Sequence, residues 1–243
     1  MFKETLKCLV KSFRADLRFP HLRVNLRNVK NLAYLKKCMG FSRDPILDPD
    51  QPAPTDPLVD LNDRRRHDAE VIATVCANAN ARTILEIGTA QGQSTALMAE
   101  NAPQATVHTV NIPPEEIKDG GKLVTHAFSR DEIGSYYRAK GMTNIRQILA
   151  NTKRWEPDIG TIDVAFVDGC HDANAVFNDT RKVLKHSKSG TIIMWHDICP
   201  ELIATYNWIA QACLGVERLY AKGLITGPTL HLEDSWIGIY RVP

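Results

Sequence analysis

The chain has 243 residues, of which 44% are hydrophobic and 24% are charged, and its formal net charge is +2. This length suits one large domain with an appendage, whose core needs neither disulfides nor metals. The sequence has no run close to the ~18 apolar residues that span a bilayer. No apolar segment followed by a small-residue cleavage site stands near the start, so we expect no signal peptide and a cytoplasmic location.

The first part of the chain is strongly basic. Residues 1–43 contain eleven Lys and Arg but two Asp and Glu, a balance of +9, whereas the remaining 200 residues have a balance of −7. Because the total is near zero, the composition gives no case for nucleic-acid binding. Apolar residues at three- and four-residue steps, with Lys and Arg between them, predict an amphipathic basic helical arm over residues 1–43. These apolar residues are Phe2, Leu6, Leu9, Phe13 and Leu17.

Two interpretations of the arm stay open. Its apolar stripe can dock on the body of the protein or on a second copy, which would make a homo-oligomer. Alternatively, it can lie on a membrane surface with Lys and Arg at anionic headgroups, giving peripheral membrane contact at the inner surface. Docking is the favoured interpretation. A proline-rich linker is expected over residues 44–60, because five prolines stand between positions 45 and 57.

The body, residues 61–243, alternates predicted strands and helices, which indicates an α/β fold with a doubly wound, mostly parallel sheet. The six cysteines form no C-x-x-C pair and suit neither a zinc site nor a disulfide framework, so most are expected to be buried apolar residues. The expected elements are helix 62–79, strand 83–87, helix 93–101, strand 106–110, helix 129–140, strands 144–149 and 162–167, helix 174–186, strand 191–195, helix 200–214, and strands 216–220 and 236–242.

A glycine motif follows the first strand of the body. Glu86, Gly88 and Gly92 form an acidic-x-Gly-x-x-x-Gly pattern between a strand and a helix. Glycines there allow a tight turn and close approach of a ligand, and the helix directs free N–H groups at an anion. The dinucleotide fingerprint fails, because Ala90 and Gln93 stand where it needs glycines.

This motif resembles motif I of class I S-adenosylmethionine-dependent methyltransferases. The resemblance implies a seven-stranded Rossmann-like sheet that binds S-adenosylmethionine over the strand ends. It implies that Glu86, Gly88, Thr89 and Gly92 line the methionine end of the cofactor. Further cofactor contacts are expected from Ser94 near the carboxylate, Asn111 at the ribose, Asn151 at the adenine or ribose, and Asp168. Asn111 is a departure, since the family usually has an acid there.

Two polar clusters follow the next strands. Asp168 and His171 come after one strand, and His196 and Asp197 after the following one. In doubly wound sheets ligands bind beyond the carboxyl ends of the strands, so the clusters are expected to converge. Carboxylates beside imidazole can hold a divalent cation or orient a hydroxyl. We interpret Asp172 as a helix cap and Trp195 as a core residue.

These clusters resemble methyltransferases of the methyltransferase-24 type, including metal-dependent sugar O-methyltransferases and the related cephalosporin-biosynthesis protein. The resemblance implies catalytic roles for Asp168 and His171, with His171 as general base. It implies magnesium or another divalent cation on Asp168, His196 and Asp197. His196 replaces the usual first acid of the pair. Because imidazole is a poor magnesium ligand, His196 implies a borderline metal, a role other than ligand, or no metal.

The sequence therefore predicts an S-adenosylmethionine-dependent O-methyltransferase that acts on a small-molecule or glycan hydroxyl, with a divalent metal assisting. One alternative is a metal-independent methyltransferase. Another is a binding protein that keeps the methyltransferase fold without catalysis, which the departures at Asn111 and His196 favour.

Overall fold

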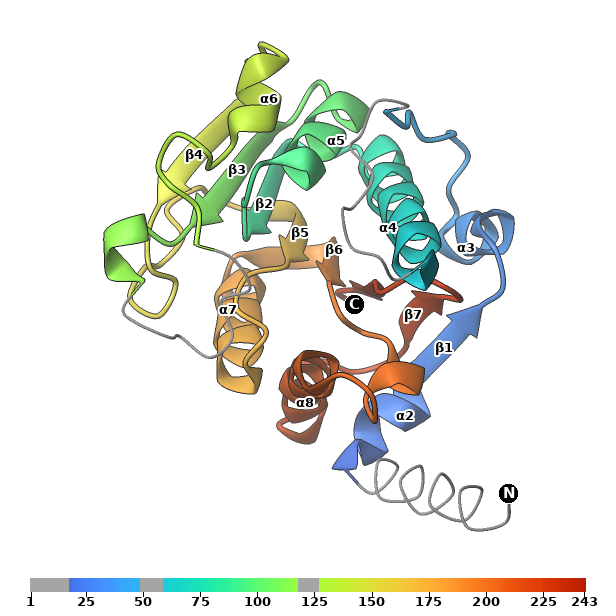
Figure 1. The fold of residues 1–243 in the computed structure, drawn as a ribbon. Coiled ribbons are helices and arrows are strands. Elements are labelled where there is room, and N and C mark those ends of the chain that lie inside the picture. Colours follow the sequence, from blue (N-terminus) through green and yellow to red (C-terminus); the bar gives the residue numbers. More distant parts are fainter. Residues whose placement is uncertain (1–17, 49–58, 118–126) are drawn as a thin grey trace.

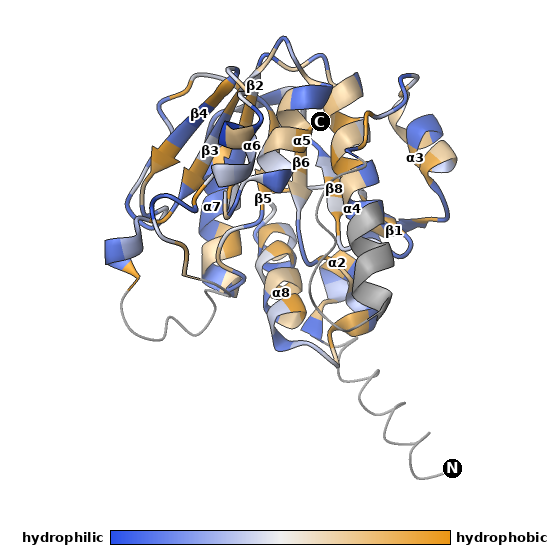
Figure 2. Ribbon diagram, turned by 45° about the horizontal axis from the view of Figure 1, so that its top comes forward, coloured by the Kyte–Doolittle hydropathy of each residue, from blue (hydrophilic) through white to orange (hydrophobic). Residues whose placement is uncertain are grey.

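The computed structural model describes residues 18–48, 59–117 and 127–243. A central twisted sheet is covered by helices on both faces, which confirms the predicted α/β, doubly wound, mostly parallel architecture (Figure 1). Figure 2 shows the hydrophobic residues concentrated in the strands and in helices such as α5 and α8 that pack on them. No helix of the described ranges has the length and apolar character that a membrane span requires.

The sheet has eight strands in the order β1-β7-β8-β6-β5-β2-β3-β4. Only β8 runs against the others, since it pairs antiparallel with both of its neighbours, β6 and β7. The carboxyl ends of the remaining strands therefore meet at one edge of the sheet. The strands are β1 (Leu26–Val29), β2 (Thr83–Ile87), β3 (Thr106–Asn111), β4 (Ile145–Leu149), β5 (Ile162–Val167), β6 (Ser187–Trp195), β7 (Thr229–Leu232) and β8 (Gly238–Arg241).

Two hydrophobic clusters form the core, one on each face of the sheet. Helices α3, α4, α5 and α6 contribute to the first cluster, and helices α2, α7 and α8 to the second. The helices are α2 (Pro20–Asn25), α3 (Leu32–Met39), α4 (Val59–Asn78), α5 (Gln93–Asn101), α6 (Ser135–Ala139), α7 (Ala173–Lys185) and α8 (Asn207–Ala221), with short 3-10 turns η1 (Pro114–Glu116) and η2 (Pro200–Leu202).

The strand count corrects the prediction of seven strands. The eighth strand, β1, comes from the segment predicted to be a helical arm, and it pairs parallel with β7 at the sheet edge. The predicted strand 216–220 is wrong, because these residues continue helix α8. The predicted helix 129–140 is shorter than expected. Ser129 and Glu132 do exchange the hydrogen bonds of a capping box, but Gly134 at φ +71° delays the helix to Ser135.

Residues 18–43 of the predicted arm dock on the body. Phe19 and Leu22 are buried in the cluster of α7 and α8, and Leu35 is buried on the opposite face. The buried carboxylate of Glu217 on α8 accepts from the backbone N–H of Leu22 at 2.7 Å and contacts Nδ1 of His21 at 2.6 Å. This part of the arm is thus integral to the domain, while residues 1–17 and most of the predicted linker lie outside the described residues.

Candidate active site

The glycine motif forms the turn between β2 and α5. Gly88 has φ +109° and Gly92 has φ +92°, a backbone region that favours glycine. Gly92 is the N-cap of α5, and no side chain caps this helix end. The first N–H groups of α5 thus remain available for an anionic group. Ser94, in the first turn of α5, is partly exposed beside them.

Gly88 also packs tightly against the backbone that follows β5, a neighbour of β2 in the sheet. A Cβ atom at this position would lie 2.0 Å from the backbone oxygen of Asp168. We expect Gly88→Ala to lower the free energy of unfolding by about 1–3 kcal/mol more than a control substitution does. The control is Gly190→Ala, because Gly190 has a similar φ of +88° with nothing within 4 Å of its Cβ position. Urea denaturation measures the stability of both variants. Equal losses would show that the strained φ alone, and not the contact with Asp168, destabilises Gly88→Ala.

The carboxyl group of Glu86 lies beneath this turn and is fully buried. Its Oε2 accepts hydrogen bonds from Thr95 and, at 2.5 Å, from Thr109. Its Oε1 is buried without a hydrogen-bond partner among the described residues. Burial raises the pKa of Glu86 to about 8, against the two hydroxyl hydrogen bonds, which lower it. The carboxyl group is therefore predominantly protonated at neutral pH.

A chain of hydrogen bonds connects Glu86 to α6. The Tyr137 hydroxyl donates to Oε1 of Gln147 at 2.8 Å, and Nε2 of Gln147 donates to Thr89 at 3.0 Å. Thr89 and Thr109 hydroxyls are 2.6 Å apart. Because Thr109 donates to Glu86, Thr89 is the donor of that pair. The Thr89 side chain thus points into this buried network, although its backbone belongs to the glycine turn.

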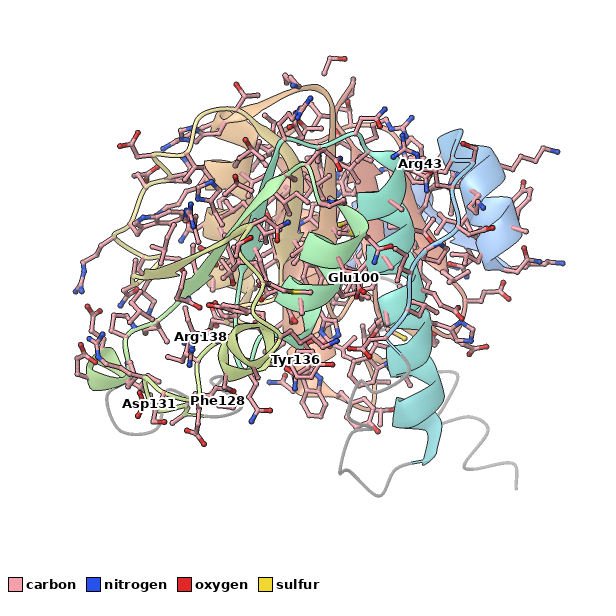
Figure 3. All side chains as sticks on the ribbon, turned by 90° about the horizontal axis from the view of Figure 1, so that it is seen from above. Arg43, Glu100, Phe128, Asp131, Tyr136 and Arg138 are labelled. Atoms are coloured by element: carbon pink, nitrogen blue, oxygen red, sulfur yellow. The ribbon has the colours of Figure 1, made fainter. Side chains whose placement is uncertain are left out.

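Helix α6 and the turn before it cover the glycine turn. The backbone N–H of Gly134 donates to Ala90 O at 2.9 Å, and that of Tyr136 donates to Gln91 O at 2.9 Å. Figure 3 shows Tyr136 and Arg138 on α6, with Phe128 and Asp131 in the segment that precedes it. This cover fixes the turn from outside, so two elements far apart in the sequence build one face of the site.

The two predicted nucleoside contacts lie at the ends of β3 and β4. Asn111 accepts from the Ala90 N–H at 3.2 Å and donates to Ile112 O at 3.0 Å, which leaves one N–H hydrogen and one acceptor position for another group. Asn151 follows β4 and donates to Oε2 of Glu116 at 2.9 Å. The carboxylate of Glu116 also contacts Arg154 at 2.7 Å.

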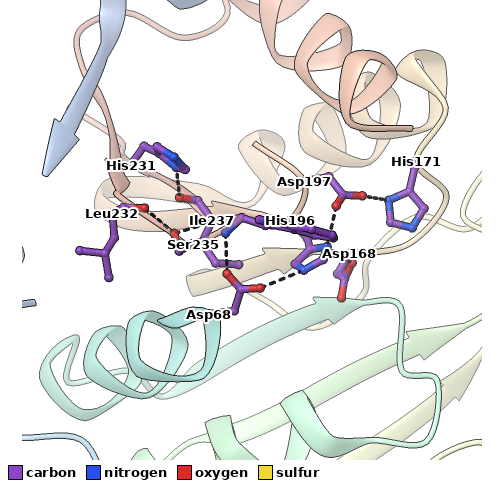
Figure 4. A network of polar contacts seen from close by, with 10 residues as sticks. Asp68, Asp168, His171, His196, Asp197, His231, Leu232, Ser235 and Ile237 are labelled. Carbon is purple, nitrogen blue, oxygen red and sulfur yellow. Dashed lines mark hydrogen bonds and ion pairs between the residues drawn. The ribbon is translucent and has the colours of Figure 1, made fainter. Parts of the chain in front are cut away.

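The two strand-end clusters converge as predicted (Figure 4). Nδ1 of His171 forms an ion pair with Oδ2 of Asp197. The Asp197 side chain is 1% exposed, whereas that of His171 is 17% exposed. Burial lowers the pKa of His171, but the Asp197 carboxylate outweighs this and holds the pKa above its usual value. The imidazole is therefore oriented by a buried anion and remains reachable from solvent.

His196 lies among three carboxylates. Its Nδ1 is 3.2 Å from Oδ1 of Asp168 and 3.3 Å from Oδ1 of Asp197, and its Nε2 is 3.4 Å from Oδ2 of Asp68. Burial lowers the pKa of His196, yet the charges of Asp168 and Asp197 raise it well above its usual value. The same burial raises the pKa of Asp168, although His196 lowers it. The ring is therefore an imidazolium held between anions.

A divalent cation fits this arrangement poorly. Ligand atoms of Asp168, His171 and His196 do lie within 4.8 Å of one another, a spacing that a cation could bridge. However, both ring nitrogens of His196 face carboxylates, and the charges of Asp168 and Asp197 favour its protonated form, in which neither nitrogen offers a lone pair. Nδ1 makes no hydrogen bond among the described residues, so these contacts are electrostatic. The predicted ligand Asp197 is engaged with both imidazoles.

Sequence reasoning missed Asp68 and Glu116 and gave Tyr137 no definite role. Asp68 comes from α4, where its Oδ1 accepts from the Trp236 N–H at 2.6 Å and its Oδ2 faces His196. Tyr137 and Glu116 contact predicted site residues from separate segments. Their positions depend on tertiary packing, and no spacing in the sequence connects them to the motifs. Asp172 does cap α7, accepting from the Asn174 N–H at 2.8 Å, and Trp195 is a buried core residue, as predicted.

Comparison with known proteins agrees with this geometry. A family model described as a methyltransferase domain matches residues 85–198, which include the glycine turn and both strand-end clusters. Residues 85–198 belong to the methyltransferase family. The match confirms the predicted resemblance to methyltransferases over these residues. No curated protein sequence matches the chain.

Solved structures share the fold of this chain at low sequence identity. The O-methyltransferase NovP is 15% identical with a TM-score of 0.56, and the alignment covers 96% of this chain and 99% of NovP. The O-methyltransferase TomG from Streptomyces achromogenes, in complex with SAM, is 14% identical with a TM-score of 0.52 over 73% of this chain and 80% of its own. A candidate O-methyltransferase from Klebsiella pneumoniae is 17% identical, with a TM-score of 0.54, and the alignment covers 86% of this chain and 94% of that protein.

Proposed function

We propose that this methyltransferase transfers the methyl group of S-adenosylmethionine to an acceptor hydroxyl, with His171 as general base and without a metal. The observation that carries the proposal is the His171–Asp197 pair, which lies beside Asp168 at the sheet edge where the glycine turn ends. The acceptor is a small-molecule or glycan hydroxyl. This acceptor class rests on the resemblance to sugar O-methyltransferases and on the O-methyltransferases that share the fold.

The residues of the glycine turn fit the cofactor. The uncapped N-terminus of α5 suits its carboxylate, with Ser94 beside it. Asn111 keeps hydrogen-bonding capacity for the ribose hydroxyls, and Asn151 stands at the end of β4 for the adenine or ribose. Asp168 supplies a carboxylate for the ammonium group. Bound there, S-adenosylmethionine supplies an electrophilic methyl group on a sulfonium. Glu86 and Thr89 support the turn from beneath.

His171 removes the proton of the acceptor hydroxyl in this proposal. The Asp197 carboxylate at Nδ1 selects the tautomer with the proton on Nδ1, which leaves Nε2 as the base. A hydroxyl is a weak nucleophile until a base takes its proton, so this step generates the reactive oxygen. Asp197 then stabilises the imidazolium that forms.

The metal-independent form of the enzyme is favoured by the environment of His196. Three carboxylates surround it, and its imidazolium neutralises part of their charge where a cation would otherwise be needed. Asp168, His196 and Asp197 thus act as an internal ion cluster that fixes the geometry of His171. The close spacing of Asp168, His171 and His196 supports a metal-assisted enzyme as the second candidate.

Two measurements test the proposed function. Titration calorimetry with S-adenosylhomocysteine tests cofactor binding, and we expect saturable binding at micromolar to low millimolar concentration. Absence of binding would contradict the methyltransferase reaction and favour the non-catalytic binding protein. Transfer of a radiolabelled methyl group to a panel of sugars, glycosides and phenols then tests the acceptor class, and a product labelled on nitrogen or carbon would contradict O-methylation.

The substitution His196→Asp is expected to create a requirement for a divalent cation. The imidazolium would be replaced by a fourth carboxylate near Asp68, Asp168 and Asp197, and oxygen ligands of this kind suit Mg²⁺ or Mn²⁺. We expect magnesium to raise the melting temperature of the variant and to have no such effect on the wild-type chain. The matched control is His67→Asp, which changes the histidine next to Asp68 in the sequence. Magnesium should not raise the melting temperature of this control. Stimulation of the wild-type activity by magnesium after chelator treatment would support the metal-assisted candidate instead.

The remaining predictions concern assembly and location. Peripheral membrane contact through residues 1–43, a homo-oligomer and a cytoplasmic location all stay proposals. The docking of residues 18–43 on the body favours a structural role for that part of the arm. Flotation with liposomes, comparing the full chain with one that lacks residues 1–17, tests the membrane proposal without removing β1. Equal flotation of the two forms would reject it.

A further inference from the structure

A second cluster of metal-ligating side chains lies outside the candidate active site. Cys199 and Glu201 follow β6, and His231 is near the carboxyl end of β7. One ligand atom from each of the three residues lies within 4.8 Å of those of the others. Cys199 is 0% exposed and His231 is 1% exposed, while the Glu201 side chain is 48% exposed. The cluster therefore has two buried donors and one at the surface.

His231 is oriented like a metal ligand. Its Nδ1 is 3.1 Å from the backbone oxygen of Ile237, to which only an N–H can donate (Figure 4). The neutral ring therefore carries its proton on Nδ1 and has its lone pair on Nε2. This Nε2 is buried and makes no hydrogen bond among the described residues. It forms a long ion pair with Oε2 of Glu201, at 4.0 Å. Metal-bound histidines typically donate their other ring N–H to a carbonyl or carboxylate in this way.

We propose that Cys199, Glu201 and His231 bind a zinc ion. A thiolate, a neutral imidazole and a carboxylate together match the donors that zinc prefers, and the thiolate disfavours magnesium and calcium. The two anionic ligands balance the charge of Zn²⁺, and the proton of the Cys199 thiol is released to solvent on binding. Zinc bonds of about 2.0–2.3 Å require ligand atoms closer together than 4.8 Å. Rotation of the half-exposed Glu201 side chain can bring its oxygen closer to the other two ligand atoms. Water completes the coordination at the exposed side.

The site would tie the loop after β6 to β7. This loop also carries His196 and Asp197, and it crosses the start of β8, where Ile198 packs against Gly238. The Ile198 N–H donates to Trp236 O at 2.9 Å, which is its hydrogen bond to the segment before β8. Zinc would add a cross-link between Cys199 and His231 beside that contact. The expected role is to stabilise the loop that positions the base, and zinc takes no part in the transfer itself.

Cobalt titration of the metal-free full chain tests the proposal, because thiolate-bound Co²⁺ has an intense charge-transfer absorption. We expect one equivalent of Co²⁺ to produce this absorption and zinc to abolish it by competition. The absorption should be absent in Cys199→Ala and retained in the control Cys76→Ala, a buried cysteine on the other face of the sheet. The active-site cluster contains no thiol ligand, so cobalt bound there would not produce this signal.

A surface variant keeps the test independent of folding. Loss of even an outer-shell partner costs about 10- to 100-fold in metal affinity, so Glu201→Gln is expected to weaken cobalt and zinc binding by at least about tenfold while the thiolate absorption persists. Zinc should also raise the melting temperature of the wild-type chain and not that of Cys199→Ala. Absence of the thiolate absorption in the wild-type chain, or its persistence in Cys199→Ala, would overturn the proposal. Unchanged affinity of Glu201→Gln for cobalt and zinc would show that Glu201 is not a ligand and would contradict the proposed three-ligand site.

Discussion

Replacing His171 with alanine is expected to lower kcat by about 10²- to 10⁴-fold, the range that a positioned general base contributes. The expectation follows from the His171–Asp197 pair, in which a buried carboxylate orients the ring toward an exposed site. The affinity for S-adenosylhomocysteine should change little, because the glycine turn and α5 do not depend on this side chain. Single-turnover methyl transfer, together with calorimetry, separates the two effects.

Two further variants define what His171 does. Asp197→Asn should also lower kcat strongly, since the amide cannot stabilise an imidazolium as a carboxylate does. Asp172→Asn is the matched control, because it changes the neighbouring carboxylate to an amide that can still accept from the Asn174 N–H and cap α7. The control should retain activity within about twofold. A kcat for His171→Ala within tenfold of the wild-type value would rule out the general-base role.

The central part of the fold could be predicted from local patterns. The apolar runs before Gly88 and before Asp168 predicted the bounds of β2 and β5 that the structure has. They could do so because a strand buried on both faces has a continuous apolar sequence. The glycine at position 92 likewise predicted the start of α5. These elements are the ones that hold the glycine turn and Asp168, so the position of the site was predictable.

The far edge of the sheet was not predictable in the same way. Residues 216–220 have the apolar character of a strand, but they form the buried side of α8, and short apolar runs do not distinguish the two. Strand β1 has two exposed polar residues, Arg27 and Asn28, before the buried Val29, so it lacks an apolar run, and it depends on pairing with β7. The seven-strand expectation from the family resemblance also gave no reason to look for β1.

The chemistry of the site was only partly visible in the sequence. The order of strands predicted that Asp168, His171, His196 and Asp197 converge, and they do. It did not predict that Asp68 on α4 closes the cluster around His196, because that contact crosses more than a hundred residues of chain. Without Asp68, His196 is interpreted as a histidine that stands in place of an acidic metal ligand. With it, both ring nitrogens face anions, which changes the chemistry expected of the site.

Glu86 gives the largest expected effect on stability. Its folded-state pKa of about 8 is above the ordinary value of 4.5, so the folded state binds a proton more tightly than the unfolded state does. Stability from this group is fully present below about pH 4.5 and falls as pH rises to about 8, by about 1.4 kcal/mol per pH unit, before it levels off. Glu86→Gln removes this loss and keeps an oxygen that can accept from Thr95 and Thr109. We expect similar stability of the two proteins at about pH 5, and a variant more stable by several kcal/mol at about pH 8.

Urea denaturation across this pH range measures the effect, and Asp163→Asn provides a control of opposite sign. Burial raises the pKa of Asp163, but Lys188 and the N–H groups of Arg82 and Thr83 lower it by more. The net pKa is therefore below its usual value, and the carboxylate is favoured in the folded state. Its contribution is present above the unfolded pKa and is lost as pH falls, so Asp163→Asn should destabilise the protein at neutral and alkaline pH. Parallel pH profiles for wild type and Glu86→Gln would mean that the carboxyl group is ionised in the fold.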